Sequence, residues 1–156
     1  MPHLSTYVGL ADHSEKTLAE FFRAVAEGHA RAVDIFHMCR TLATMSDSHR
    51  DRLAPLVNRY GEQQSSEVRE PERLHAEGLA GVRQGDIGLL RDLQDLHVLA
   101  SLVQTTWIVL AQGAQGIRDR ELLSVATDAN TDTSRQLTWL NTRMKAVAPQ
   151  ALILGL

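Results

Sequence analysis

The chain has 156 residues, the length of one domain that can enclose a single hydrophobic core. Hydrophobic residues make up 44% of it and charged residues 22%, as in a soluble globular protein and unlike a disordered chain. The formal net charge of -3 argues against a nucleic-acid-binding domain, because such domains usually carry an excess of basic side chains. The single cysteine, Cys39, excludes an intramolecular disulfide and a cysteine-based zinc finger.

The apolar residues recur at steps of three and four, which predicts helices and no strands. Asp12 and Glu15 have the spacing of a capping box, so the first helix is expected to begin there. Residues 46–48 (Ser-Asp-Ser) are predicted to form the turn before the second helix, because serine and aspartate are preferred N-caps. The predicted helices span about 13–45, 47–70, 86–113 and 119–147, followed by an apolar tail at 150–156.

Residues 71–85 contain a proline and several glycines and are predicted to connect the second and third helices. A connection of roughly fifteen to twenty residues can run along a bundle and place the third helix antiparallel to the first. The sequence therefore predicts an all-α protein: one domain, residues 1–156, folded as an antiparallel four-helix bundle of two helical hairpins joined by a crossover.

One uncharged stretch, from Leu96 to Ile117, is long enough to cross a bilayer. It also contains His97, glutamines and threonines, which a hydrocarbon environment disfavours. We therefore expect a buried helix in the bundle, and not a membrane span. The first ten residues carry no basic leader with a long apolar run, so we expect a cytoplasmic protein with neither membrane nor nucleic acid as its partner.

The order of hairpin, crossover and hairpin resembles the ferritin-like four-helix bundle superfamily over nearly the whole chain. The resemblance implies a di-iron site in which two helices each carry a glutamate and the other two each carry a Glu-x-x-His motif. Glu20 or Glu27 could stand for the glutamate of the first helix. A Glu-x-x-His motif occurs at residues 72–75, but it follows Pro71 at a helix start, outside the long apolar stripes.

The second hairpin departs from the ferritin-like pattern. The predicted third helix has no glutamate, and no histidine follows His97, so a second Glu-x-x-His motif is not encoded. The chain therefore resembles members of the superfamily that have lost or changed their metal ligands. It also contains no Gly-x-Ser-x-Gly motif and no glycine-rich phosphate loop, so the sequence gives no support to nucleophilic catalysis.

The candidate site is built around His29, which falls on the apolar stripe of the predicted first helix. If the first hairpin folds about Ser46, Glu62 comes level with His29, and the polar part of the fourth helix around Asp132 reaches the same height. These three residues would form a buried polar layer. Such a layer could hold a divalent metal ion through nitrogen and oxygen ligands, or fix the helix register by hydrogen bonds alone.

The C-terminal run of residues 151–154 (Ala-Leu-Ile-Leu) is apolar and costly to expose to water. We expect it to pack on its own bundle or on a second copy, so that the protein forms a homodimer through the tail or through a face of the bundle. The favoured function is a non-catalytic interaction or assembly module without a cofactor. The alternative is a metal-binding bundle protein, redox-active or not, with a non-standard histidine and carboxylate site for a divalent ion.

Overall fold

A computed structural model describes residues 2–61 and 81–154 and confirms the all-α fold. Within these residues there are four long helices and no strand. They are α1 (Pro2–Gly28), α2 (Val33–Gly61), α3 (Gly85–Gly116) and α4 (Arg120–Leu152). Helix α1 packs along α2 and α3, and α4 packs along α3 and α2, which makes a four-helix bundle.

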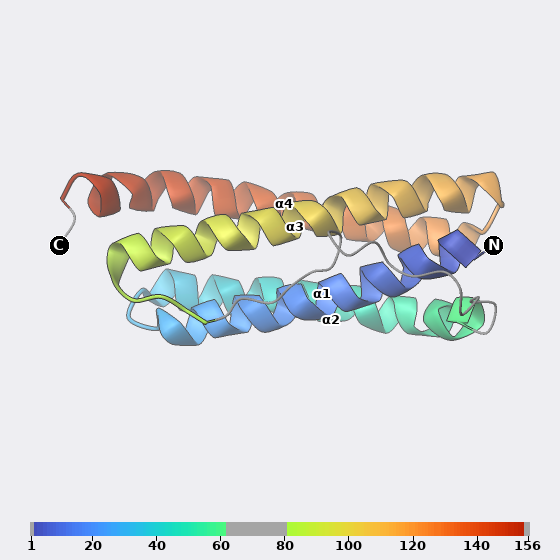
Figure 1. The fold of residues 1–156 in the computed structure, drawn as a ribbon, viewed down its shortest axis with the longest axis horizontal. Coiled ribbons are helices and arrows are strands. Elements are labelled where there is room, and N and C mark those ends of the chain that lie inside the picture. Colours follow the sequence, from blue (N-terminus) through green and yellow to red (C-terminus); the bar gives the residue numbers. More distant parts are fainter. Residues whose placement is uncertain (1, 62–80, 155–156) are drawn as a thin grey trace.

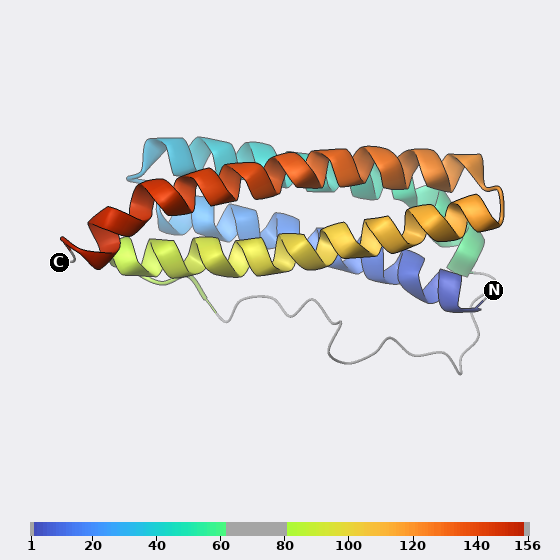
Figure 2. The same cartoon turned by 90° about the horizontal axis from the view of Figure 1, so that it is seen from above.

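The helices form two antiparallel hairpins, with α1 beside α2 and α3 beside α4 (Figure 1). Helix α2 ends at one end of the bundle and α3 begins at the other, as both views show (Figure 2). The end of α2 and the start of α3 thus lie at opposite ends of the bundle, and α3 runs antiparallel to α1, as predicted. Most of the connection predicted at residues 71–85 lies outside the described residues.

The predicted boundary between the first two helices is wrong. Helix α1 already begins at Pro2, which suits a first helical turn because proline there loses no helical hydrogen bond. The helix ends at Gly28, and α2 starts at Val33, so the turn occupies residues 29–32 and not 46–48. The boundary between the helices predicted at 13–45 and 47–70 is therefore misplaced by about 17 residues along the chain.

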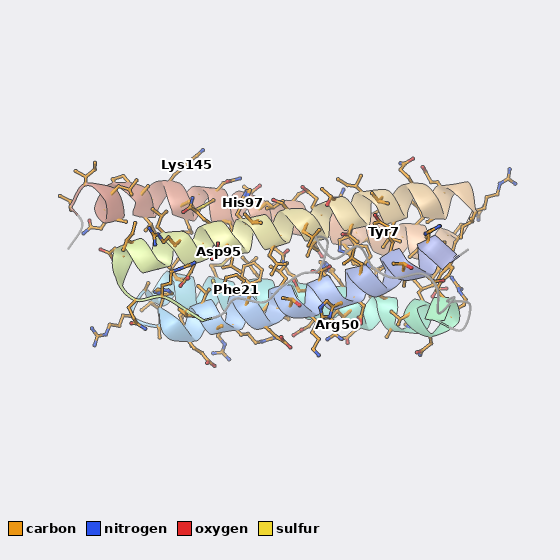
Figure 3. The ribbon with its side chains drawn as sticks, in the orientation of Figure 1. Tyr7, Phe21, Arg50, Asp95, His97 and Lys145 are labelled. Carbon is orange, nitrogen blue, oxygen red and sulfur yellow. The ribbon has the colours of Figure 1, made fainter. Side chains whose placement is uncertain are left out.

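The residues expected to form that turn lie inside α2, and two of them make contacts between helices. Ser46 is fully buried and accepts a hydrogen bond from Gln136 of α4. Asp47 forms an ion pair with Arg23 of α1. Their polar side chains therefore serve packing between helices and not a turn, which local propensity cannot distinguish. Asp12 does not cap a helix either, because it lies within α1 and pairs with Arg50 of α2. Figure 3 labels Arg50, which lies on the α1–α2 side of the bundle.

The second hairpin follows the prediction more closely. Helix α3 spans the expected residues, and the side chain of Asp119 caps α4 by accepting a hydrogen bond from the backbone N–H of Leu122. Arg118 turns the loop between them with a left-handed backbone (φ 59°). Helix α4 runs past Pro149 to Leu152, so the start of the predicted tail is helical. Leu152, Ile153 and Leu154 are exposed.

The core is lined by seam residues, at alternating steps of three and four along each helix. In α3 the seam includes Leu93, Leu96, Val103, Trp107 and Leu110, all completely buried. Among the described residues, α3 is also the one helix whose length and composition would permit a membrane span. Its inner face packs against α1 and α4, as expected for a core helix.

Candidate functional site: a buried polar layer

A buried histidine joins three of the four helices near the middle of the bundle. Nδ1 of His49, on α2, is hydrogen-bonded to the carboxylate of Glu15 on α1. Nε2 of the same ring lies 2.9 Å from Oδ2 of Asp132 on α4. Both ring nitrogens are therefore occupied by carboxylates that approach from opposite sides of the imidazole.

Further polar groups continue this contact toward α3 and α4. Nε2 of Gln136 donates to the backbone carbonyl of Leu42 at 3.0 Å and to the hydroxyl of Ser46 at 3.1 Å. The ring of Trp107, on α3, meets the imidazole of His49 edge-on, with 6.3 Å between ring centroids. We call this set the polar layer, and its members are Glu15, Ser46, His49, Trp107, Asp132 and Gln136.

The polar layer is closed to solvent on all but one side. Glu15 and Gln136 are 0% exposed and His49 is 2% exposed, whereas the side chain of Asp132 is 30% exposed. Burying ionisable groups is costly unless they are paired, and the carboxylates on the two nitrogens supply that pairing. The polar layer therefore contacts solvent through the side chain of Asp132.

Burial and pairing shift the proton equilibria of the polar layer. Burial raises the pKa of the Glu15 carboxyl above its ordinary value, although His49, Ser46 and Trp107 act to lower it. Burial acts to lower the pKa of His49, but Glu15 and Asp132 outweigh it, so this pKa is raised as well. The polar layer thus keeps its proton to a higher pH than the separate groups would.

Three buried atoms of the polar layer make no hydrogen bond of normal geometry, although Trp107 lies close enough to Glu15 to lower the pKa of its carboxyl. They are Oε1 of Glu15, Oε1 of Gln136 and Nε1 of Trp107. Two of them are acceptors and one is a donor. A buried polar atom without a hydrogen bond lowers the stability of the fold by about 1–3 kcal/mol. Hydrogen bonding in the polar layer is therefore least complete at these atoms.

The helical pattern explains why these side chains meet. In α1 the buried seam runs through Ala11, Glu15, Leu18, Phe22 and Val25, in steps of four and three. In α2 the seam likewise includes both Ser46 and His49. A residue on the seam points into the bundle whatever its polarity, and residues of two helices at one height must therefore meet.

The sequence analysis missed Glu15 and His49 as core residues. Glu15 was expected to cap a helix start, and His49 fell in the first turn of the helix predicted at 47–70. Extending the apolar stripe of the first helix from Leu18 by three residues would have reached Glu15. Correct placement of the turn at 29–32 would then have put His49 opposite it.

The structure does not bring together the predicted site residues His29 and Asp132. Nε2 of His29 lies 2.8 Å from Oδ2 of Asp92, at the end of the bundle. Asp92 also accepts hydrogen bonds from the backbone N–H and the guanidinium of Arg83. Asp132 instead meets His49 at the height of Glu15, which is about 21 Å from His29 along α1 at ~1.5 Å per residue. Glu62 lies outside the described residues.

The arrangement of carboxylates explains how the polar layer differs from a metal site. Among residues 2–61 and 81–154, no group of three histidine, cysteine, aspartate or glutamate side chains is gathered as metal ligands would be. Glu15 and Asp132 face different nitrogens of His49, so the three side chains do not converge on one point. A metal ion would need at least one of the two hydrogen bonds to break first.

Cys39 provides no nucleophile. It is completely buried on the seam of α2, and burial raises the pKa of its thiol to about 12. Only the thiolate is reactive, so this side chain stays an inert part of the core at neutral pH.

No family model, curated protein or solved structure matches this chain. What the polar layer can do must therefore be inferred from its own chemistry. It places the imidazole of His49 between two carboxylates, links α1, α2 and α4 to one another, and reaches water through Asp132.

Proposed function

We propose that this chain is a ferritin-like bundle that acts as a non-catalytic interaction or assembly module. The observation that supports this most directly is the double engagement of His49 by Glu15 and Asp132. A histidine with both ring nitrogens committed has no lone pair for a metal ion. A base this deeply buried is also out of reach of a substrate.

The positions in the polar layer support the ferritin-like part of the proposal. In the di-iron proteins, Glu-x-x-His motifs on two helices and single glutamates on the other two point inward. Ser46 and His49 have that spacing on α2, and the buried pair Thr133 and Gln136 has it on α4. Glu15 meets His49 from α1. Only Glu15 and His49 of these residues are of the metal-binding type.

A metal titration tests the proposal. Chelator-treated protein is titrated calorimetrically with Fe²⁺, Mn²⁺ and Zn²⁺, and its thermal unfolding is followed with and without each ion. We expect no stoichiometric binding to the polar layer and no change in Tm on chelation. One ion bound per chain, lost in both the Glu15→Gln and the His49→Gln variant, would overturn the non-catalytic assignment.

The competing function is binding of a divalent metal ion. The observation in its favour is the pair of buried oxygens, Oε1 of Glu15 and Oε1 of Gln136, that accept no hydrogen bond. Carboxylate and amide oxygens suit hard cations such as Mg²⁺ and Mn²⁺. In the same titration this function predicts binding of Mn²⁺ that requires Glu15 and Gln136.

A restored ligand set tests the ferritin-like positions separately. Ser46→Glu with Thr133→Glu and Gln136→His would give Glu-x-x-His motifs on α2 and α4 beside Glu15. We expect this variant to be destabilised without metal, because several charges are buried. Added Mn²⁺ or Zn²⁺ should raise its Tm. No response to either ion would contradict the assignment of these positions.

A further inference from the structure

Hydrogen bonding in the polar layer is incomplete at two acceptors and one donor. The acceptors are Oε1 of Glu15 and Oε1 of Gln136, and the donor is the indole N–H of Trp107. All three side chains are completely buried, so bulk water does not solvate these atoms. Buried polar atoms almost always bond to the chain or to a bound molecule, which leaves a partner to be identified here.

The three side chains come together at the centre of the bundle. Ser46 and Trp107 lie close enough to the Glu15 carboxylate to act to lower its pKa, and Oγ of Ser46 lies 3.1 Å from Nε2 of Gln136. Glu15 and Gln136 belong to α1 and α4, which lie diagonally across the bundle because each packs along α2 and α3. Side chains from diagonal helices meet near the bundle axis, so the three atoms surround one region of the core.

The side chains themselves do not satisfy these atoms. Neither the indole of Trp107 nor the hydroxyl of Ser46 makes a hydrogen bond of normal geometry with either oxygen. A flip of the Gln136 amide would not help, because Nε2 donates to the backbone carbonyl of Leu42 at 3.0 Å and an oxygen there would face another oxygen. The chemistry of the three atoms therefore points to a bound molecule.

We propose that one water molecule is bound at the centre of the polar layer. It donates to Oε1 of Glu15 and to Oε1 of Gln136, and it accepts from the indole N–H of Trp107. Water has two donor hydrogens and lone pairs that accept, so its capacity matches two acceptors and one donor. Three hydrogen bonds to otherwise unsatisfied groups are also typical of a buried water.

The same atoms disfavour an ion at this position. A cation would suit the two oxygens, but the indole N–H of Trp107 presents a positively polarised hydrogen to it. An anion would suit the indole and be repelled by both oxygens. The set therefore selects a small neutral molecule that both donates and accepts. This selection rests on the proposed function, in which no metal ion occupies the polar layer.

The bound water would bring α3 into the hydrogen-bonded network. His49 joins α1, α2 and α4 through its two ring nitrogens. The water joins α1, α3 and α4 through Glu15, Trp107 and Gln136. All four helices then share one network, and such a network fixes the heights of the helices relative to one another.

Oxygen-17 relaxation dispersion of the solvent tests this inference on the full chain, because it counts water molecules that stay bound for longer than the protein takes to tumble. A chain of this size usually holds several buried waters, so the readout is a difference between variants. Trp107→Phe and Gln136→Met each remove one partner, and each should lower the count by one. Trp139→Phe and Gln104→Met are the matched controls, at half-buried positions outside the polar layer, and should leave it unchanged.

A second measurement needs no variant. In the wild type, the indole proton of Trp107 should show a nuclear Overhauser effect to water with the sign of a long-lived complex. The indole proton of Trp139 should show only the weak effect of surface hydration or none. If the core variants lose their helical circular dichroism, this comparison within the wild type provides the test.

Three outcomes would overturn the inference. An unchanged count in both Trp107→Phe and Gln136→Met, with native circular dichroism, shows that these atoms hold no long-lived water. Absence of the Overhauser effect at Trp107 shows the same, and both results leave the metal titration, and with it the proposed function, unaffected. Loss of the water on addition of Mg²⁺ assigns the two oxygens to a cation and contradicts the proposed function as well.

Discussion

At the residue scale, the chemistry of the bundle concentrates on His49. Its ring lies between a fully buried carboxylate, Glu15, and a partly exposed one, Asp132. Each carboxylate alone would leave a ring nitrogen unpaired in a dry environment. Burial of an unpaired imidazole would be unfavourable. With both carboxylates in place, the His49 side chain instead connects three helices through hydrogen bonds.

Stability should fall as the pH rises from about 6 to about 8.5. The pKa of His49 is raised above its ordinary value of 6.5, and that of Glu15 is raised above 4.5. The folded chain therefore binds more protons than the unfolded chain above those values, and stability decreases with pH until the raised values are passed. Urea unfolding at the two pH values measures this.

The control for that pH dependence is His49→Gln. Because glutamine does not titrate, the difference in unfolding free energy between about pH 6 and about pH 8.5 should shrink in this variant. An equal difference in the wild type and the variant would show that other groups cause the pH dependence.

Removal of the imidazole should be costly. His49→Ala leaves Glu15 buried without a counter-charge and opens a cavity, so we expect a loss of about 3–5 kcal/mol in unfolding free energy. His97→Ala on α3 is the matched control, because His97 is half-buried and, among the described residues, its side chain has one hydrogen-bond contact, with Ser101 at 3.5 Å. It should cost less than about 1 kcal/mol. Equal losses in the two variants would argue against a special role for the polar layer.

At the element scale, a single turn decides the register of the first hairpin. The turn at 29–32 places Glu15 opposite His49, whereas a turn at 46 would have placed Glu62 opposite His29. Gly28, directly before this turn, permits a close packing contact. A Cβ atom on Gly28 would lie 2.4 Å from Cγ1 of Val82, so the side chain of Val82 packs directly against the end of α1.

Gly28→Ala is therefore expected to destabilise the protein, by about 1–3 kcal/mol, because Val82 and its backbone must move. Gly9→Ala is the control within the same helix. A Cβ at Gly9 meets nothing within 4 Å, and alanine is the better helix former by about 1 kcal/mol, so that variant should be more stable than the wild type. Thermal unfolding of both variants and the wild type measures these changes in stability. A neutral Gly28→Ala variant would contradict the close contact.

The helices of the second hairpin were predictable from sequence, and the boundary within the first hairpin was not. Near α4, Asp119 carries a local capping signal that the structure uses. In the first hairpin the strongest local signals, Asp12 with Glu15 and Ser46 with Asp47, serve contacts between helices instead. A propensity argument sees only neighbours in sequence, so it cannot recognise a polar residue whose partner lies on another helix.

The sequence predicted the type of candidate site, a buried polar layer, but not the residues that form it. A buried polar layer with histidine and Asp132 was expected, and such a layer exists. Its histidine is His49 and not His29, because an error in the turn shifts every pairing between the first two helices. The seam spacing still gives a usable rule, since Glu15, Ser46 and His49 all continue the apolar stripes of their helices.

At the scale of the whole molecule, the bundle directs its polar chemistry inward and leaves an uncharged face outward. The polar layer ties α1, α2 and α4 together. The outer face of α3 remains uncharged over its last two-thirds. A bundle that is closed inside and uncharged on one outer face is suited to association more than to turnover, in keeping with the proposed assembly function.

The central claim is that both nitrogens of His49 are held by carboxylates, and nitrogen-15 NMR of the His49 ring tests it most directly. At neutral pH we predict that Nδ1 and Nε2 both have the chemical shifts of protonated nitrogens, with slowly exchanging ring protons. The Asp132→Ala variant should change Nε2 more than Nδ1. A neutral ring with one free lone pair, or ring protons that exchange at once with solvent, would contradict the account.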